Sequence, residues 1–374
     1  MTAFVWGAGS SDFGRQTDRL AAELAWEAVH EALVDAEVDS VDAAFVGTVF
    51  GPFGVAQRSL VGAGLAGVPV VTVENACASG STALHEAKEA IESGRYERVL
   101  VLGVEHLTSR FSGPIASDGT DAEQAAGLLF PGLYAMSASR YLHEHDLEPA
   151  DLAHVAVKNS AHGALNPRAQ RRRALSLEEV MGSRMIASPL TLFQCAGLSD
   201  AAAALVLGSR RRSPRDVAVR ASALGSGGPW DHASPHVWGY DLVADTARRA
   251  YATAAIEPGE ADVVELHDAF TIGEIVTLEA LGLASEGEAP SAVAAGEHSL
   301  GGRTPVNPSG GLLSRGHPLG ATGVAQVVEL TSQLRGEAGG RQVDGARLGL
   351  LETMGGGAAG VDGNACVVAV FEGG

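Results

Sequence analysis

The sequence has few cysteines, few basic residues and no long apolar run, and each shortage excludes a class of protein. Its three cysteines, Cys77, Cys195 and Cys366, form an odd and sparse set that supports neither a disulfide framework nor a zinc site. With 26 basic against 45 acidic residues, the net charge of −19 argues against a nucleic acid as partner, although a local basic cluster could still hold a small anion. No stretch is long and apolar enough to span a membrane.

Targeting signals and lysines are scarce as well. Residues 1–9 have neither a basic region nor an apolar run, so they do not resemble a signal peptide. Lys88 and Lys158 are the only lysines, and this bias toward Arg, with abundant Ala and Gly, suggests a bacterium with a GC-rich genome. Together with the sparse cysteines, this composition predicts a protein of the reducing bacterial cytoplasm.

The abundant residues indicate a layered α/β fold. Hydrophobic residues make up 46% of the 374 positions and aromatic residues only 5%, while Gly occupies 48 positions. A core of such small side chains lets helices and strands approach closely. Helical spacing over 19–35 is followed by a strand pattern over 41–50, and the short apolar runs at 98–104 and 202–208 are typical of buried strands. This alternation favours an α/β fold.

The second half of the chain repeats the pattern of the first. A helix, a short acidic turn and a strand occur early in each half, and a small-residue helix begins at Cys77 in one half and at His317 in the other. This order predicts an internal duplication. We expect an N-terminal half over residues 1–215, a C-terminal half over 216–374, and a less regular cap over the site from about 105–195.

Cys77 is the first candidate for chemistry. It follows an apolar strand end, Val73-Glu-Asn-Ala, and precedes a helix of small residues, Ala78-Ser-Gly-Ser-Thr-Ala-Leu. The positive end of a helix dipole favours a thiolate, which is the nucleophilic form. A lone cysteine is more often a buried structural residue, but this strand–cysteine–helix setting favours a nucleophile.

Two histidines lie in settings that suit a site. His267 and Asp268 follow the apolar run Val263-Val-Glu-Leu, and strand ends are where sites gather in α/β folds. His317 lies among closely spaced glycines at an expected helix start, where a neutral imidazole is favoured. A backbone-satisfied histidine and an incidental turn histidine are the alternatives. One cysteine and two histidines on separate loops fit acyl transfer through a thioester.

A glycine-rich stretch near the C-terminus, Leu351-Glu-Thr-Met-Gly-Gly-Gly-Ala-Ala-Gly, could supply backbone N–H groups to an oxyanion. A phosphate-binding loop is excluded because the stretch lacks the Lys-Ser/Thr ending of that motif. By itself the stretch is a weak signal.

Three segments resemble the signatures of thiolases: the Cys77 segment, His267-Asp-Ala-Phe, and Gly316-His-Pro-Leu-Gly-Ala-Thr-Gly. The best match is the SCP2-type, or lipid-transfer-protein-type, branch, which the stretches Val157-Lys-Asn-Ser-Ala-His-Gly-Ala-Leu-Asn-Pro and Leu334-Arg-Gly-Glu-Ala-Gly-Gly-Arg-Gln-Val also resemble. The resemblance covers nearly the whole chain. It implies two βαβαβαββ halves in an α-β-α-β-α sandwich, a loop domain inserted in the first half, and a dimer or tetramer.

The resemblance also assigns roles to residues. It implies that Cys77 accepts the acyl group, that His317 activates it, and that His267 helps to hold the thioester oxygen. Gly355 would supply one amide of the second oxyanion hole and Cys77 the other. The substrate would be a coenzyme A thioester with an acceptor, and no cofactor or metal ion would be bound permanently.

The sequence departs from the family where thiolases carry a second catalytic cysteine. The position near the C-terminus is Thr353, and the position that the SCP2-type branch uses is Ala269. Without this acid/base, which contributes about 10²–10⁴ in rate, removal of an α-proton from an acyl-CoA is harder. Cys195 and Cys366 are interpreted as packing residues.

Several functions follow, in order of preference. The first is an acyl-CoA C-acyltransferase that forms an S-acyl-Cys77 intermediate and passes the acyl group to a second substrate. The second is a decarboxylative condensing enzyme or acyltransferase of a biosynthetic pathway, or a thiolase-like aldolase that depends on a small OB-fold partner protein. The third is a non-catalytic acyl-CoA- or lipid-binding module, which the retained Cys77, His267 and His317 disfavour.

A basic cluster in the expected cap is a candidate for binding the coenzyme A phosphates. It consists of Arg168, Arg171 and Arg172, with Arg173 completing the run. A solvated loop face is the equal alternative. The acyl chain, the acceptor and the direction of the reaction stay open.

Overall fold

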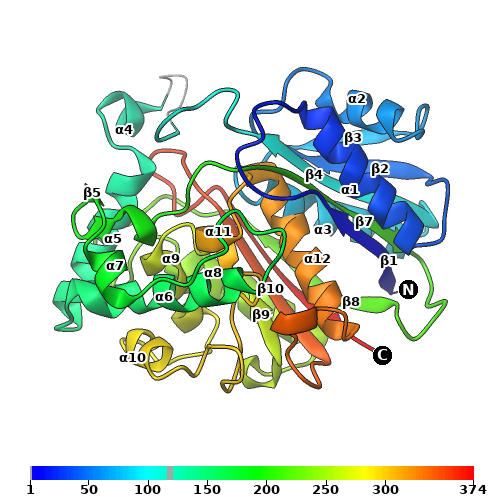
Figure 1. The fold of residues 1–374 in the computed structure, drawn as a ribbon. Helices are drawn as coiled ribbons and strands as arrows, with labels where there is room; N and C mark the ends of the chain where they lie inside the picture. Colours follow the sequence, from blue (N-terminus) through cyan, green and yellow to red (C-terminus); the bar gives the residue numbers. More distant parts are fainter. Residues whose placement is uncertain (1, 116–120) are drawn as a thin grey trace.

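The computed structural model describes residues 2–115 and 121–374, and its centre is a nine-stranded mixed sheet (Figure 1). The strand order is β3-β2-β4-β7-β1-β8-β11-β10-β9. In chain order the strands are β1 (Ala3–Ser10), β2 (Ala43–Gly47), β3 (Val70–Val73), β4 (Arg98–His106), β7 (Asp200–Gly208), β8 (Val217–Gly225), β9 (Val263–Glu265), β10 (Leu348–Gly355) and β11 (Ala365–Glu372).

The strand pairings confirm the predicted duplication. In the first half β2 pairs in parallel with β3 and β4, and β4, β7 and β1 follow in antiparallel pairs. In the second half β9 pairs in parallel with β10 and forms a parallel bridge through Val264 to Val306, and β10, β11 and β8 follow in antiparallel pairs. The halves meet where β1 pairs with β8.

Helices cover both sheet faces and fill the space between the halves, so the predicted α-β-α-β-α layering is confirmed (Figure 1). Three apolar cores separate the layers. Helices α1 (Ala21–Asp35) and α2 (Val55–Gly62) pack on the outer face of the first half, α3 (Ser79–Glu92) and α12 (Thr322–Leu334) lie in the middle, and α8 (Tyr240–Ala254) and α9 (Thr271–Ala280) pack on the second half.

The small side chains are what allow this close layering. A Cβ at Gly7 of β1 would lie 2.2 Å from the carbonyl oxygen of Ala32 on α1, and one at Gly80 of α3 would lie 2.6 Å from the carbonyl oxygen of Gly320. Both distances are shorter than any van der Waals contact. The glycine content noted in the sequence therefore permits backbone to lie directly against backbone.

The cap is more regular than the sequence suggested. It contains α4 (Ala122–Ala125), α5 (Phe130–Glu144), α6 (Pro149–Ala164), α7 (Leu177–Met181) and the short strands β5 (Met185–Ala187) and β6 (Leu190–Thr191). Pro at the first turn and a reciprocal Glu148–Asp151 capping box start α6, and its face of Leu152, Val155, Ala156 and Asn159 is buried. Helices α5 and α6 pack on α9, and α7 packs on α6.

Short elements complete the chain. They are α10 (Ala289–Ala294), α11 (Gly311–Ser314) and the 3₁₀ helices Leu192–Gln194, Pro258–Glu260, Leu319–Ala321 and Gly339–Arg341. Among the described residues, every helix is too short or too polar to traverse a lipid bilayer.

Candidate active site

The structure brings Cys77, His267 and His317 together, although each comes from a different loop. Cys77 lies in the turn between β3 and α3, His267 directly after β9, and His317 between α11 and α12. The thiol sulfur and one ring nitrogen of each histidine all lie within 4.8 Å of one another. The two imidazole rings meet edge to face at 5.0 Å between centroids. All three residues are buried.

A tight turn presents the Cys77 sulfur. Ala76 has a φ of +48°, a left-handed conformation that is strained for a residue with a Cβ. The Ser79 hydroxyl donates to the Ala76 carbonyl at 2.6 Å, and the Asn75 N–H donates to the Ser79 hydroxyl at 2.9 Å, so the turn is held from both sides. Strain that is over-determined in this way is typical of functional sites.

Burial opposes the thiolate that the helix start favours. It raises the pKa of the Cys77 thiol to about 12, and the Glu105 carboxylate acts in the same direction. The backbone N–H groups of Cys77 and Gly356 face the sulfur and oppose this shift, but they do not outweigh burial. Burial thus works against the thiolate, and formation of the thiolate calls for a nearby base.

His317 can serve as that base. Burial, helped by His267 and Arg315, holds its pKa well below the usual range, so the imidazole is neutral. The Thr322 hydroxyl donates to the Pro318 carbonyl at 3.1 Å and therefore accepts from His317 Nδ1 at 2.8 Å. This arrangement places the ring proton on Nδ1 and leaves the lone pair of Nε2 free to accept a proton.

His267 is also neutral, because burial lowers its pKa to about 3. Its backbone N–H donates to the buried carboxyl of Glu352 at 2.9 Å. Its ring atom Nδ1 is buried and has no partner within the described part of the chain. A neutral imidazole in this position could donate a hydrogen bond to a bound substrate or accept one from it.

The three residues line one cavity of about 290 Å³. Its walls are largely apolar and come from the cap as well as from both halves, with Tyr134 on α5 stacked on Phe270 at 4.3 Å between ring centroids. Two exposed arginines, Arg15 and Arg184, line its solvent end. The cavity can therefore enclose a small ligand whose far end is anionic.

The family comparison agrees with this geometry. Residues 1–211 match the family model for the thiolase N-terminal domain, and residues 230–362 match the model described as thiolase C-terminal domain-like. The chain belongs to the thiolase family. It is an acyltransferase of this family.

Relatives extend over nearly the whole thiolase chain. An acetyl-CoA acetyltransferase of Methanothermobacter thermautotrophicus is 40% identical, with 94% of this chain and 96% of the relative covered. Sterol carrier protein 2 of Homo sapiens is 37% identical over 95% of this chain and 70% of its own length. The benzoylsuccinyl-CoA thiolase subunit BbsB of Thauera aromatica is 35% identical, and the match covers 95% of this chain and 94% of the relative.

Solved structures give the same fold. The Ltp2–ChsH2(DUF35) aldolase matches with a TM-score of 0.85 and 26% identity over 100% of this chain and 98% of its own. Human mitochondrial 3-ketoacyl-CoA thiolase matches with a TM-score of 0.72 and 17% identity, again over 100% and 98%. The second similarity supports the thiolase fold alone.

The glycine loop of this thiolase begins beside the Cys77 turn. Gly355 is the last residue of β10, opposite Ala365, and a Cβ there would lie 2.2 Å from the carbonyl oxygen of Asn75. Its small size thus lets β10 approach the Cys77 turn. The backbone amide of Gly356 acts on the sulfur, so Gly356 joins Gly355 as a candidate oxyanion donor.

No ionisable side chain occupies the two positions of the missing cysteine. The Thr353 hydroxyl is buried and donates to the Gln326 side chain at 2.6 Å, whereas Ala269 lines the cavity. Cys195 also lines the cavity, but its thiol donates to the Thr191 carbonyl at 3.3 Å. Cys366 is fully buried on β11, with its sulfur 3.8 Å from the Glu352 carboxyl.

The predicted phosphate-binding arginines do not line the cavity. Arg168 pairs with Glu31 at 2.7 Å, Arg171 lies over the ring of Phe193, and Arg172 donates to the Pro167 carbonyl. These partners are residues distant in sequence or a backbone carbonyl group. The run of basic residues alone could not reveal such contacts. Arg15 and Arg184, which do line it, carried no signal in the sequence because each stands alone.

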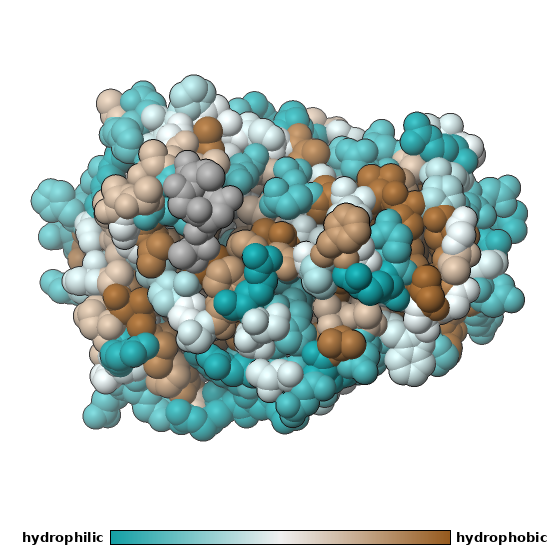
Figure 2. Space-filling model, turned by 90° about the horizontal axis from the view of Figure 1, so that it is seen from above, coloured by the Kyte–Doolittle hydropathy of each residue, from teal (hydrophilic) through white to brown (hydrophobic). Residues whose placement is uncertain are grey.

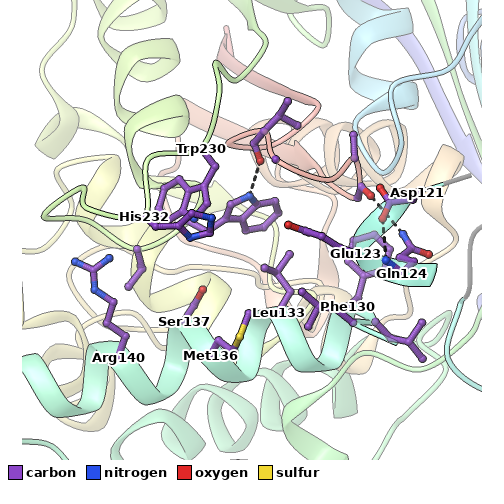
Figure 3. A pocket seen from close by; sticks show the side chains of 18 residues that line it. Asp121, Glu123, Gln124, Phe130, Leu133, Met136, Ser137, Arg140, Trp230 and His232 are labelled. Atoms are coloured by element: carbon purple, nitrogen blue, oxygen red, sulfur yellow. Dashed lines mark hydrogen bonds between the residues drawn. The ribbon is translucent and has the colours of Figure 1, made fainter. Parts of the chain in front are cut away.

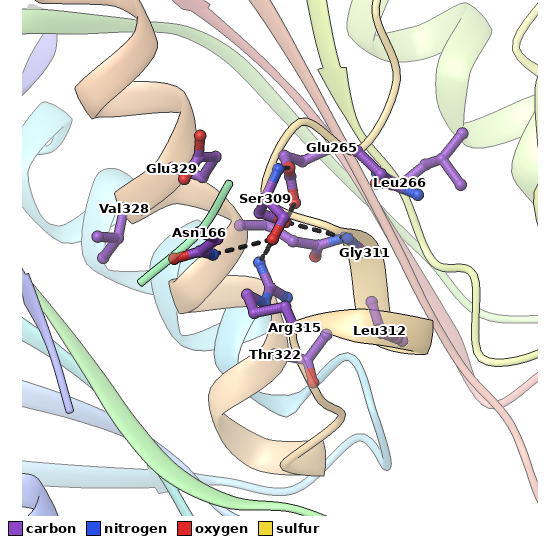
Figure 4. A network of polar contacts seen from close by, with 12 residues as sticks. Asn166, Glu265, Leu266, Ser309, Gly311, Leu312, Arg315, Thr322, Val328 and Glu329 are labelled. Carbon is purple, nitrogen blue, oxygen red and sulfur yellow. Dashed lines mark hydrogen bonds and ion pairs between the residues drawn. The ribbon is translucent and has the colours of Figure 1, made fainter. Parts of the chain in front are cut away.

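A buried ion pair links the loops that carry the two histidines (Figure 4). Glu265 lies two residues before His267 and Arg315 two residues before His317, and their side chains meet at 3.2 Å. Glu265 also accepts from the N–H and hydroxyl of Ser309 at 3.0 and 2.8 Å, and Figure 4 shows these groups converging on one point. The pair fixes the spacing of the two loops.

A second buried network ties the cap to the site. Asp268, next to His267, accepts from the Asn159 amide at 2.7 Å and from the Leu312 N–H at 2.6 Å. Lys158 pairs with Glu274 at 3.0 Å. This network gives a structural reason for the Lys158-Asn159 stretch of α6.

Proposed function

We propose that this thiolase is an acyl-CoA C-acyltransferase that forms an S-acyl-Cys77 intermediate and passes the acyl group to a second substrate. The observation that carries the proposal is the buried set of Cys77, His267 and His317 within 4.8 Å, in a cavity with two arginines at its open end. A binding module would need no such set of groups.

In the proposed first step, the Cys77 sulfur attacks the carbonyl carbon of an acyl-CoA and the bond from that carbon to the coenzyme A sulfur breaks. The thiol proton passes to His317 Nε2 and from there to the leaving sulfur. The N–H groups of Cys77 and Gly356, which face the sulfur, are the proposed donors to the oxyanion. His267 is proposed to hold the thioester oxygen of the second substrate. Arg15 and Arg184 are proposed to bind the coenzyme A phosphates.

The second step is proposed to avoid α-proton removal by a cysteine, because Ala269 and Thr353 occupy the positions of the missing acid/base. Decarboxylative condensation and transfer to another nucleophile both satisfy this condition. An aldolase that depends on a partner is the second candidate. It is favoured by the similarity to the Ltp2–ChsH2(DUF35) aldolase and by the relative named as a thiolase subunit. A small OB-fold protein is the proposed partner.

A homodimer is proposed on the edge of the sheet. Strand β3 is an edge strand of the nine-stranded sheet, and Val71 on it is 47% exposed. Phe53 and Val61 nearby are also exposed, and Figure 2 shows apolar side chains gathered on this part of the surface, over α2 and β3. An exposed apolar edge is a surface for pairing with a second copy.

Exchange of labelled coenzyme A into unlabelled acyl-CoA tests the proposed half-reaction without an acceptor. Wild-type protein is expected to catalyse the exchange and Cys77→Ala to lose it. Incubation with a chelator should leave the exchange unchanged, since a thiol and two imidazoles could also ligate zinc. Exchange that survives in Cys77→Ala would contradict the proposal.

A further inference from the structure

A second large cavity, here called the aromatic pocket, lies near Cys77 and is not part of the site described so far. Its volume is about 380 Å³. Figure 3 shows α5 forming one wall, with Leu133, Met136 and Ser137 directed into the space, and Trp230 and His232 opposite. The rest of the wall comes from α4, from the segment 128–130, from Val237 and Trp238, and from the loop that follows β10.

A third cavity, of about 140 Å³, lies beside both this pocket and Cys77. Cys77 and Gly356 are among the residues that line it. Gln124, Phe130 and Gly357 line both this third cavity and the aromatic pocket. Cys77 therefore borders the arginine-lined cavity already described and, by way of the third cavity, neighbours the aromatic pocket.

The walls of the aromatic pocket are held in place. The Asp121 carboxylate accepts from the Ala359 N–H at 2.7 Å, which fixes α4 to the glycine loop. Across the pocket, Arg140 donates to the backbone carbonyls of residues 234–236 and pairs with Glu144. A Cβ at Gly357 would lie 2.7 Å from the ring of Phe130, so glycine is needed there for the wall to close.

We propose that the aromatic pocket binds the acyl group carried on Cys77, and that this group contains an aromatic or alicyclic ring. The inference rests on the proposed acyl-enzyme and names the class of acyl group that this site takes. The acyl chain leaves the Cys77 sulfur beside Gly356, passes Phe130 and ends between α5 and Trp230.

The volume, the lining residues and the charges of the aromatic pocket favour an acyl group that contains a ring. At ~30 Å³ for each water-sized group, the pocket holds on the order of a dozen such groups, far more than an acetyl group fills. Two indole rings and the Phe130 ring offer flat apolar faces, which pack well against a ring. Asp121 and Glu123 line the pocket and disfavour an anionic acyl group.

The test compares the rates at which acetyl-CoA and 3-phenylpropionyl-CoA acylate Cys77, followed by intact mass. Met136→Trp fills the aromatic pocket, and Met185→Trp is the matched control, because both methionines are 54% exposed and Met185 lines none of the cavities described here. Leu133→Trp, also on the pocket wall, is a second variant.

Wild-type protein is expected to accept both donors. Met136→Trp and Leu133→Trp should slow acylation by 3-phenylpropionyl-CoA about tenfold or more and change the rate with acetyl-CoA less than about twofold, while Met185→Trp changes neither. An equal effect on both donors in both pocket variants, or no effect, would overturn the inference. Acylation of wild type by acetyl-CoA alone would also overturn it and leave the proposed function standing. Acylation by neither donor would defeat the proposed function itself.

Discussion

Cys77 is 8% exposed, and its thiol lies within 4.8 Å of a nitrogen of the neutral His317 imidazole. Two effects compete there. The helix start and the amides favour the thiolate, and burial with the Glu105 carboxylate opposes it and prevails. In the proposed mechanism, Cys77 is thus kept as a thiol until a substrate and His317 act together.

Alkylation of Cys77 by iodoacetamide should report this balance. Because the pKa of the folded thiol is raised to about 12, the thiolate fraction at pH 7 to 9 is small and grows about tenfold per pH unit. The rate, followed by mass spectrometry of the Cys77 peptide, is expected to rise over this range without a plateau. A plateau near pH 7 would show a depressed pKa and contradict the account.

The membership of single residues in the site was predictable from sequence only where a motif carried them. Cys77, His267 and His317 lie in short, unusual segments, and the structure places them within 4.8 Å of one another. Arg184 and Tyr134 lie in no motif. They join the cavity because the cap folds over the site, and no local pattern encodes that contact.

At the scale of secondary-structure elements, the loop after β9 and the loop before α12 act as one unit. The Glu265–Arg315 pair joins them, and both side chains are buried. The N–H and hydroxyl groups of Ser309 donate hydrogen bonds to the Glu265 carboxylate. In contrast, Nε and Nη2 of Arg315 have no hydrogen-bond partner among the described residues.

Arg315→Met should therefore destabilise the protein by roughly 3–5 kcal/mol, since it leaves a carboxylate buried without its cation. Burial already raises the pKa of Glu265 to about 7, so the carboxyl can take up a proton and the cost should be smaller below pH 7 than above it. Chemical unfolding at pH 6 and pH 8 measures the difference.

The double variant Glu265→Met/Arg315→Met serves as the control for this prediction. It removes both charges and is expected to recover a large part of the lost stability. If the single and the double variant lose the same free energy of unfolding, the ion pair itself is not what couples the two loops.

The order of elements was more predictable than their packing. Apolar runs and the repeated helix–strand order predicted two equivalent halves, and β2, β4, β9 and β10 occupy the expected places. The helices α5 and α6 were missed within the cap. Their buried faces mix a few large apolar residues with small and polar ones such as Ala138, Ala156 and Asn159, and this mixture gives a weak helical signal in sequence.

At the scale of the whole molecule, we propose that a second copy pairs at the β3 edge. Val71→Lys puts a charge on that edge and should shift the protein toward a monomer, measured by sedimentation velocity at several concentrations. Leu165→Lys is the matched control, because Leu165 is also 47% exposed but lies at the end of α6. A dimer that persists in Val71→Lys would place the interface elsewhere.

The central claim is that an acyl group is carried on Cys77. Intact mass after mixing with a panel of acyl-CoA thioesters tests it most directly, with Cys77→Ala beside Cys195→Ala and Cys366→Ala as matched controls. The account predicts one acyl adduct on wild type and on both control variants, and none on Cys77→Ala. No adduct from any donor on folded protein, or an adduct that survives in Cys77→Ala, would contradict it.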